Sequence, residues 1–331
     1  MTTQKLRVSV ALCTYNGSRF LPEQLASIAA QTRLPDELVV CDDGSSDATP
    51  QIVADFGNSA PFPVRFFRNP RNLGSTKNFE QAIGLCTGDL IALCDQDDIW
   101  LPEKMARQAE MMEHDPALGG VFSDAELVDD KSQPIGKRLW ASYLFTSAEQ
   151  RRFKTGKGVA VLLKRNVVTG ATLMIRSDLQ SLFGPIPDMW VHDGWIAWMM
   201  ILYSTLALIE DPLIQYRLHA GQQIGVEAIA LHSSLSLLER LRKGKLEEPA
   251  KQRTCVLEME ELGRRLQVSH VGLDESIFLH IRQKTQFLND RADGDRSRLL
   301  RITRLLFHLK SYRLYESGYK CLLRDVIMMF V

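Results

Sequence analysis

Short apolar runs alternate with helical patterns along the first 125 residues. Runs rich in Val, Ile and Leu, which predict buried strands, span 6–13, 38–41, 64–67, 89–94 and 119–122. Between them, apolar side chains recur at helical spacing, most clearly over 20–31, 76–86 and 102–114. Strands that alternate with helices predict an α/β fold, with a mainly parallel central sheet covered by helices on both faces.

Polar clusters follow four of these predicted strands. They are Thr14-Tyr15-Asn16, Asp42-Asp43, Asp95-Gln96-Asp97-Asp98 and Ser123-Asp124. In a parallel sheet the carboxyl ends of the strands meet at one edge, and ligands bind there. We therefore expect these hydroxyl and carboxylate groups to share one site.

The alternation breaks after about residue 125. The stretch 129–165 reads as an irregular, partly mobile loop, and 167–175, 206–209 and 213–217 read as strands, with a Trp-rich helix within 187–203. Beyond residue 225 only helical spacing is visible, over 231–242, 252–266, 275–288 and 298–307. We expect a domain over 1–225 and a helical C-terminal extension over 226–331.

Composition narrows the functional classes. Lys+Arg and Asp+Glu both number 40, so the net charge of zero argues against a nucleic-acid binder that relies on bulk charge. The first 225 residues carry a net −5 and the rest a net +5, so the acidic part could hold a metal ion. The six cysteines form no CxxC pair, and the first residues lack a signal-peptide pattern, which together indicate a cytoplasmic protein.

The cluster Asp95-Gln96-Asp97-Asp98 is the strongest chemical signal. Three carboxylates within four residues repel one another unless a cation lies between them. Hard divalent ions such as Mg²⁺ or Mn²⁺ prefer oxygen ligands and often keep phosphate oxygens in their shell. An acidic turn that caps the following helix is the alternative, but carboxylates at neighbouring strand ends favour the metal site.

Seven blocks, in this order, resemble family 2 glycosyltransferases over roughly residues 6–225. They read VSVALCTYNG, LVVCDDGSSD, NLGSTKNFEQA, IALCDQDDIWLPEK, VVTGATLMIRSDL, WVHDGW and YRLHAGQQIG. The resemblance implies the GT-A fold and an inverting enzyme that uses nucleotide sugars. The combination of DQDDIW, HDGW and YRLH is similar to bacterial polysaccharide and rhamnosyl-type transferases.

The resemblance also implies roles for individual positions on the donor side. The residues expected to hold the nucleotide sugar are Thr14, Tyr15, Asn16, Asp43, Asn72, Gly74, Lys77, Asp95 and Arg217. Asp43 is expected to accept from a pyrimidine N3–H, which favours a dTDP- or UDP-sugar. Asp97, Asp98 and His219 are expected to hold Mg²⁺ or Mn²⁺. The family tail often reads YRxHxxN, whereas this chain has Gln222, which weakens the assignment on the diphosphate side.

On the acceptor side, Asp193 of HDGW matches the catalytic base of the family. It could also cap the helix that follows, and His192 reads as its polar neighbour. Acceptor contacts are expected from Asp124, Gly170, Trp190 and Trp195.

The sequence thus predicts transfer of a sugar, such as rhamnose or a hexose, from a pyrimidine nucleoside diphosphate to a hydroxyl group. The acceptor would be a saccharide or lipid-linked saccharide in cell-surface polysaccharide synthesis. Two alternatives are a nucleotidyltransferase, although no Gly- and Lys-rich phosphate loop follows the first strand, and a non-catalytic nucleotide-sugar-binding module. The C-terminal helices, basic and apolar near the end, could contact the inner face of the membrane peripherally or pair in a homodimer.

Overall fold

The computed structural model describes residues 5–220, 237–268, 275–292 and 308–316. The chain divides into two compact units. The first comprises Met1–Gly158 and Val167–Glu227, and the second comprises Val159–Asn166 and Ala228–Val331.

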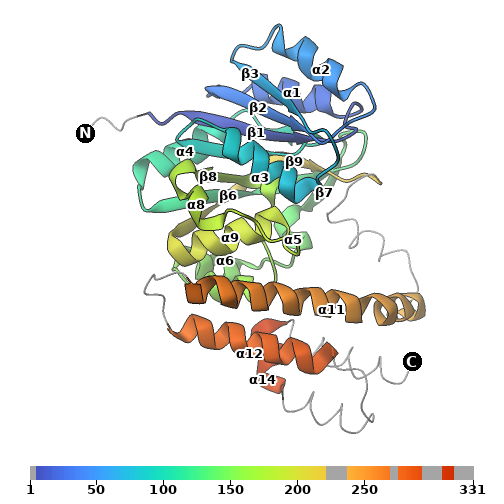
Figure 1. Cartoon of the computed structure of the whole chain (residues 1–331), viewed down its shortest axis with the longest axis vertical. Coiled ribbons are helices and arrows are strands. Elements are labelled where there is room, and N and C mark those ends of the chain that lie inside the picture. The colour runs from blue at the N-terminus through green and yellow to red at the C-terminus, as the bar shows by residue number, and fades with distance from the viewer. Residues whose placement is uncertain (1–4, 221–236, 269–274, 293–307, 317–331) are drawn as a thin grey trace. The chain divides into compact units, whose positions relative to one another are not determined.

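The first unit is built on a nine-stranded sheet (Figure 1). Its strands are β1 (Val8–Thr14), β2 (Glu37–Asp42), β3 (Val64–Arg68), β4 (Leu90–Cys94), β5 (Ile99–Trp100), β6 (Leu118–Val128), β7 (Pro134–Arg138), β8 (Leu173–Arg176) and β9 (Thr205–Arg217). The order across the sheet is β3-β2-β1-β4-β8-β6-β9-β5, and β7 pairs with β6. β3, β2, β1 and β4 are parallel, as the alternating pattern predicts.

The helices α1 (Leu21–Ala29), α2 (Thr49–Gly57) and α3 (Ser75–Leu85) connect these parallel strands. The helix α4 (Lys104–His114) leads from β5 to β6. Cys13 of β1 lies opposite Cys41 of β2, and Leu12 lies opposite Cys94 of β4, so the three strands end level with one another. This register brings the polar turns that follow them to one edge of the sheet.

β8 interrupts the parallel order. It runs antiparallel to both of its neighbours, β4 and β6, so β6 is again parallel to β4. The 3-10 helix η1 (Gly170–Thr172) directly precedes β8, so the strand is shorter than the predicted 167–175. A second 3-10 turn η2 (Ser177–Leu179), the short helix α8 (Gln180–Phe183) and the apolar helix α9 (His192–Tyr203) then lead to β9.

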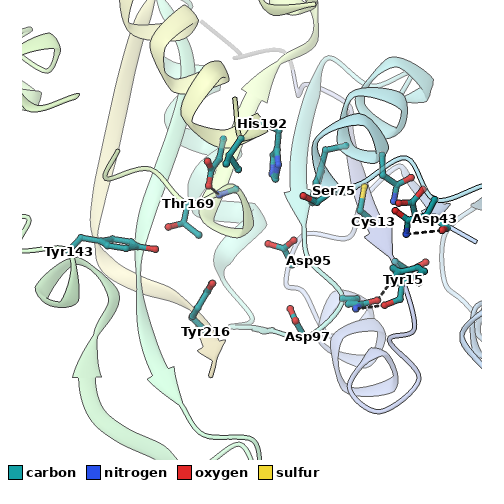
Figure 2. A pocket seen from close by; sticks show the side chains of 18 residues that line it. Cys13, Tyr15, Asp43, Ser75, Asp95, Asp97, Tyr143, Thr169, His192 and Tyr216 are labelled. Atoms are coloured by element: carbon teal, nitrogen blue, oxygen red, sulfur yellow. Dashed lines mark hydrogen bonds between the residues drawn. The ribbon is translucent and has the colours of Figure 1, made fainter. Parts of the chain in front are cut away.

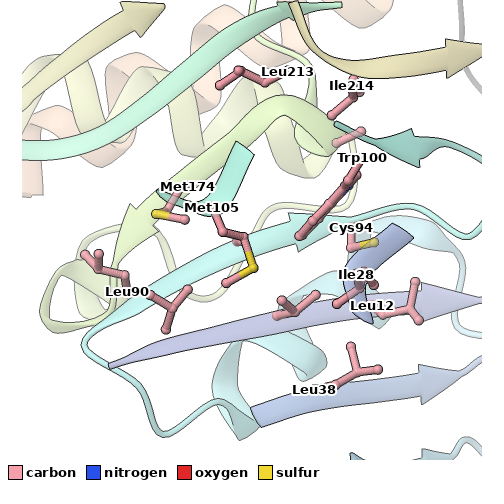
Figure 3. Packing of buried hydrophobic residues seen from close by; sticks show 14 of the residues in the cluster. Leu12, Ile28, Leu38, Leu90, Cys94, Trp100, Met105, Met174, Leu213 and Ile214 are labelled. Carbon is pink, nitrogen blue, oxygen red and sulfur yellow. The ribbon is translucent and has the colours of Figure 1, made fainter. Parts of the chain in front are cut away.

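The core of this unit lies between the sheet and its helices (Figure 3). Alternate residues of β1, including Leu12, point to one face of the sheet and pack with Ile28 of α1 and Met105 of α4. Trp100 of the short strand β5 joins the same cluster with 2% of its surface exposed. Burial of these apolar side chains contributes roughly 25 cal/mol per Å² removed from water.

The stretch 129–165 is not the irregular, partly mobile loop that the sequence pattern predicts. It contains β7, α5 (Leu139–Ser142), α6 (Ser147–Lys154) and α7 (Val159–Leu162). Aromatic rings explain this order, because Phe122 of β6 packs at centroid distances of 5.6 Å from Trp140 and 5.3 Å from Phe153.

The structure also differs from the predicted strand at 119–122 and from the two predicted strands at 206–209 and 213–217. β6 continues to Val128 instead of ending at Phe122, and 206–209 and 213–217 form the single strand β9. The two long strands pair in parallel from Leu118 to Val128, with irregular register around Asp124. Asp124 therefore lies within a strand and not at its end.

The described residues of the second unit are mainly helical. Its main helices are α11 (Leu237–Val268), α12 (Glu275–Ala292) and α14 (Leu309–Tyr315). α11 is one helix where the sequence pattern predicts two, over 231–242 and 252–266. Phe287 of α12 packs edge-on against Tyr312 of α14 at 4.9 Å. The predicted helix 298–307 and the apolar C-terminal end lie outside the described residues.

Across the described ranges, each helix is too short or too polar to cross a lipid bilayer.

Glu37 ties together the edge of the sheet opposite the polar turns. Its carboxylate accepts hydrogen bonds from Ser9 Oγ at 2.7 Å, Thr87 N at 2.6 Å and Arg65 Nη1 at 2.9 Å. Burial raises the pKa of Glu37, but these hydrogen bonds outweigh burial and lower it from 4.5 to about 2. The stabilisation is therefore complete above about pH 4.5 and is lost as the pH falls through about 2.

We predict that Glu37→Gln lowers the free energy of unfolding by about 2 kcal/mol at pH 7, because charge-assisted hydrogen bonds are lost. The difference from the unaltered protein should shrink below pH 4.5. Urea unfolding at pH 7, 4.5 and 3 measures this, with Glu110→Gln on the exposed face of α4 as the control. An equal loss at all three pH values would contradict the assignment.

Candidate functional site

A cavity opens at the carboxyl ends of β1, β2 and β4 (Figure 2). Its lining combines strand-end turns with residues from α3, the start of α9 and β9. The lining residues are Cys13, Thr14, Tyr15, Asp43, Asn72, Ser75, Asn78, Phe79, Asp95, Gln96, Asp97, Tyr143, Thr169, Gly170, Val191, His192, Asp193 and Tyr216. The cavity thus brings together residues that are up to two hundred positions apart in the chain.

Gln96 joins the turns after β1 and β4. Its Oε1 accepts from Tyr15 N at 2.8 Å, and its Nε2 donates to the Tyr15 carbonyl at 3.0 Å. A Cβ at Gly17 would lie 2.1 Å from Gln96 Oε1, so a larger residue at Gly17 would displace this side chain. The Gln96 bridge therefore holds the aromatic ring of Tyr15 at the mouth of the cavity.

Asp43 organises the side of the cavity next to the loop before α3. Its Oδ1 accepts from Asn69 Nδ2 at 2.9 Å and from Leu73 N at 2.8 Å, and its Oδ2 accepts from Gly74 N at 2.9 Å. The loop before α3 is folded around this carboxylate. A carboxylate oxygen can accept two hydrogen bonds, so Oδ2 retains capacity for a ligand donor.

Four of the predicted donor-side residues do not line the cavity. The Asn16 side chain accepts from Ser46 N at 2.8 Å and shapes the turn after β1. Gly74 adopts φ +82° and acts through its backbone N–H to Asp43. Lys77 contacts Glu80 at 2.9 Å and the Ile186 carbonyl at 2.5 Å.

Arg217 is the fourth. It is 1% exposed, and its Nε donates to the Asp97 carbonyl at 2.8 Å, while its backbone N–H donates to Asp98 Oδ1 at 3.0 Å. It thus fastens the acidic turn to β9 from behind, without reaching the cavity.

Three of the carboxylates that line the cavity, Asp95, Asp97 and Asp193, are close enough for the charges of the latter two to act on Asp95. Burial, followed by the negative charges of Asp97 and Asp193, raises the pKa of Asp95 from 3.8 to about 8. Such mutual repulsion in a buried place is relieved when a cation binds.

His219 completes the polar groups beside Asp97. Its Nε2 lies 2.8 Å from Asp97 Oδ2, and its ring packs 4.7 Å from that of Phe20. Among the described residues, no group of three or more His, Cys, Asp or Glu side chains forms a metal cage by itself. The pair fits a divalent ion whose shell is completed by ligand oxygens, as Mg²⁺ commonly requires.

Asp98 is close to Asp95 and Asp97 but, unlike them, is not exposed to the cavity. It is fully buried and does not line the cavity, and burial raises the pKa of its carboxyl well above the usual value. Beneath it, the buried Lys104 ammonium lies 3.7 Å above the ring of Trp100. The placement of Asp98 therefore suits bracing of the acidic turn and not the direct metal contact that the resemblance implies.

Asp193 enters the cavity from the first turn of α9. Its Oδ2 accepts from Gly170 N at 3.2 Å, which links the start of α9 to η1. A Cβ at Gly170 would lie 2.7 Å from His192 Nε2, so close packing requires glycine here. Gly170 also lines the cavity.

His192 is the other polar residue of this turn. Its ring stacks on Phe79 at 4.0 Å, and burial lowers its pKa from 6.5 to about 3, so the ring is neutral at physiological pH. A base that keeps so little affinity for a proton is poorly matched to proton abstraction near neutrality. The chemistry of this turn therefore favours Asp193 over His192.

The other residues expected on the acceptor side do not line the cavity. Trp195 is fully buried and its Nε1 donates to the Phe183 carbonyl at 2.7 Å, while Trp190 packs on it at 5.5 Å and is 6% exposed. Neither ring lines the cavity, because Trp195 belongs to the mostly buried helix α9 and Trp190, which precedes α9, packs against Trp195. Asp124 also lies outside the lining.

Several lining residues escaped the sequence analysis. Ser75 and Asn78 lie at the start of α3, within the recognised block NLGSTKNFEQA, so their position was available as a signal. Tyr216 likewise lies within the recognised block YRLHAGQQIG, whereas Tyr143 had no such signal, because it belongs to the stretch read as a loop.

Comparison with known proteins places this geometry in a family. Residues 9–182, more than half of the chain, match the family described as glycosyl transferase family 2. An uncharacterized glycosyltransferase of Nostoc sp. is 24% identical over 223 residues, which are 65% of this chain and 66% of that protein. An uncharacterized protein of Mycobacterium tuberculosis is 26% identical over 216 residues, 64% of this chain and 59% of that protein. The chain thus spans less than two thirds of the length of either relative.

Two solved structures share the fold. S. aureus TarS 1–349 in complex with UDP-GlcNAc superposes with a TM-score of 0.54 at 18% identity, covering 97% of this chain and 89% of that chain. The mannosyltransferase PcManGT from Pyrobaculum calidifontis, in complex with GDP-Man and Mn²⁺, gives a TM-score of 0.54 at 18% identity, covering 98% and 87%. The expected GT-A fold is confirmed. With the family match over residues 9–182, the chain belongs to glycosyl transferase family 2.

Proposed function

We propose that this protein is an inverting glycosyltransferase that moves a sugar from a pyrimidine nucleoside diphosphate to an acceptor hydroxyl. The observation that carries the proposal is that Asp95, Asp97 and Asp193 line one cavity, although Asp193 is about one hundred positions from the others. Asp43 lines the same cavity at the end that also holds Tyr15 (Figure 2). One cavity can therefore hold a nucleotide, its diphosphate and a sugar in sequence.

In the proposed reaction, a carboxylate oxygen of Asp193 takes the proton of the acceptor hydroxyl. The acceptor oxygen forms a bond to the anomeric carbon while the bond from that carbon to the diphosphate oxygen breaks. The single displacement inverts the anomeric centre, and the nucleoside diphosphate leaves with the electron pair. General base help of this kind contributes typically ~10²–10⁴-fold.

Asp97 and His219 are the residues that would hold a divalent ion, with Asp95 beside them. When bound, Mg²⁺ or Mn²⁺ supplies positive charge for the leaving diphosphate. None of the described residues that line the cavity is Lys or Arg, so its own side chains offer no cation for that role. The solved mannosyltransferase with GDP-Man and Mn²⁺ supports a divalent ion in a protein of this fold.

The donor is proposed to be a dTDP- or UDP-sugar, such as dTDP-rhamnose or a UDP-hexose. Asp43 Oδ2 has capacity for the N3–H of a pyrimidine, whereas a carboxylate cannot donate to an acceptor nitrogen. TarS, of similar fold, was solved with UDP-GlcNAc. We further propose a saccharide or lipid-linked saccharide acceptor, in synthesis of cell-surface polysaccharide on the cytoplasmic side.

Replacement of the base tests the mechanism. We predict that Asp193→Asn lowers the transfer rate by at least ~10²-fold while donor binding stays within about threefold, because the amide cannot take a proton. Nucleotide release coupled to a colorimetric assay measures transfer, and calorimetry measures donor binding. Asp178→Asn, on the exposed 3-10 turn η2, is the control. Near-normal transfer by Asp193→Asn would remove the base assignment.

Removal of metal tests the role of Asp97. We predict that EDTA abolishes transfer and that Mg²⁺ or Mn²⁺ restores it, because the cavity lining lacks another cation. His219→Ala should raise the Mn²⁺ concentration for half-maximal rate by about tenfold or more, as loss of a ligand weakens a metal site. An unchanged rate in chelator speaks against metal dependence.

Nucleotide selectivity tests the role of Asp43. With Mn²⁺ present, UDP and dTDP should bind at least about tenfold more tightly than ADP, because the ring nitrogen of adenine is an acceptor and one matched hydrogen bond to a charged group is worth ~1.5–3 kcal/mol. Thermal stabilisation at equal nucleotide concentration ranks the three ligands. Equal stabilisation by ADP would refute the proposed role of Asp43. Release of pyrophosphate in place of nucleoside diphosphate would indicate a nucleotidyltransferase.

A further inference from the structure

The segment that carries Tyr143 forms a wall of the cavity that the sequence pattern did not reveal. It runs from Leu139 of α5 to Phe145 and lies between β7 and α6. The Phe145 N–H donates to the Trp140 carbonyl at 2.8 Å, which closes the segment into a compact turn. Leu144 adopts φ +55° and points outward with 64% of its surface exposed, while Tyr143 lines the cavity.

Asp124 fixes this segment to the sheet. Its Oδ1 accepts from Trp140 N at 3.0 Å, and the carboxylate is buried within β6. The rings of Trp140 and Phe145 pack edge-on at 5.1 Å, and Phe145 packs edge-on against Phe153 at 6.0 Å. The wall is therefore anchored by one charge-assisted hydrogen bond and a cluster of buried rings.

Tyr143 points into the cavity on the side of the proposed base. Figure 2 shows its hydroxyl directed toward Thr169, with Tyr216 beside it and with Tyr15 and Asp43 on the opposite side. The side chains of Tyr143 and Thr169 share a hydrogen bond, and the charge of Asp193 is close enough to act on the phenol. Burial, with a contribution from Asp193, raises the pKa of Tyr143 to about 12, so it remains a protonated donor.

The geometry of a single displacement indicates which side of the cavity the acceptor would occupy. In a single displacement the acceptor oxygen approaches the anomeric carbon from the face opposite the leaving diphosphate, where the base must lie. The nucleotide end lies at Asp43, so the space beside Asp193 and away from Asp43 belongs to the acceptor. Tyr143, Thr169 and Tyr216 offer hydroxyls and aromatic rings there, and none of the described lining residues is Lys or Arg.

We propose that Tyr143 binds an uncharged sugar ring of the acceptor beside Asp193, and that Asp124 is the positioning residue that holds Tyr143 in place. The proposal rests on the proposed function and adds the class of acceptor. An aromatic ring with a hydroxyl matches a sugar, which has an apolar face and hydroxyl groups at its edge. A phosphate or carboxylate of the acceptor would lie beside the carboxylate of Asp193, and none of the described lining residues is a Lys or Arg that could offset the repulsion.

The test separates acceptor binding from donor chemistry. Purified protein with Mn²⁺ is given dTDP-rhamnose or a UDP-hexose, and nucleoside diphosphate release is measured with and without neutral 4-nitrophenyl hexopyranosides. We expect Tyr143→Ala to raise the KM for the glycoside by about tenfold or more while acceptor-free donor hydrolysis stays within about twofold. Tyr143→Phe, which keeps the ring, should show a smaller increase.

Matched variants and ligands give the control and the contrary outcomes. Leu144→Ala changes the outward neighbour of Tyr143 and should leave the KM for the glycoside unchanged. An equal rise in the donor KM and the acceptor KM for Tyr143→Ala would overturn the assignment to the acceptor. Preference for 4-nitrophenyl glucuronide, or no stimulation by any neutral glycoside while hydrolysis is intact, would overturn the uncharged class. Absence of nucleotide release in every condition would instead count against the proposed function.

Asp124 is tested by rescue. Asp124→Ala removes the oxygen that accepts from Trp140 N and should raise the KM for the glycoside as Tyr143→Ala does, with donor hydrolysis unchanged. Asp124→Asn keeps an acceptor oxygen and should restore the KM to within about threefold. If Asp124→Ala instead lowered hydrolysis and transfer equally, Asp124 would support the fold only, and its positioning role would be refuted.

Discussion

The level register of β2, β1 and β4 is the constraint on which the site depends. Because parallel strands of matched length end together, the turns that follow Cys41, Cys13 and Cys94 have to share one edge. Gln96 and Asp43 then fasten those turns to their neighbours through backbone N–H and carbonyl groups. A shift of one residue in this register would turn the side chains to the other face of the sheet and dismantle the cavity.

The same constraint concentrates negative charge. Asp95, Asp97 and Asp193 lie in a cavity whose described lining has no Lys or Arg side chain, and burial makes their repulsion stronger than it would be in water. Arg217 contributes positive charge from behind the turn, but it is fully used by Glu23, Asp97 and other partners within the protein. The arrangement therefore favours ligands that bring their own cation, which suits a metal-bound diphosphate.

The opposite side of the cavity is built by a different principle. There, the packing of Trp140, Phe145 and Phe153 around Phe122 fixes the geometry together with the hydrogen bond from Trp140 N to Asp124, and Tyr143 is held at the wall. Gly170 allows His192 and Asp193 to approach η1 closely.

The sequence by itself determined the parallel strands, the turns at their ends and the candidates Asp43, Asp95 and Asp97, because periodicity and strand-end chemistry are local properties. Asp193 was a candidate only because the block WVHDGW resembles family 2 glycosyltransferases. Tertiary structure decided the rest. The stretch 129–165 became ordered, Asp124 moved into a strand, and Trp190 and Trp195 became core residues, because aromatic rings find partners that are distant in the chain. Which face a side chain presents depends on these long-range contacts, and no local pattern encodes them.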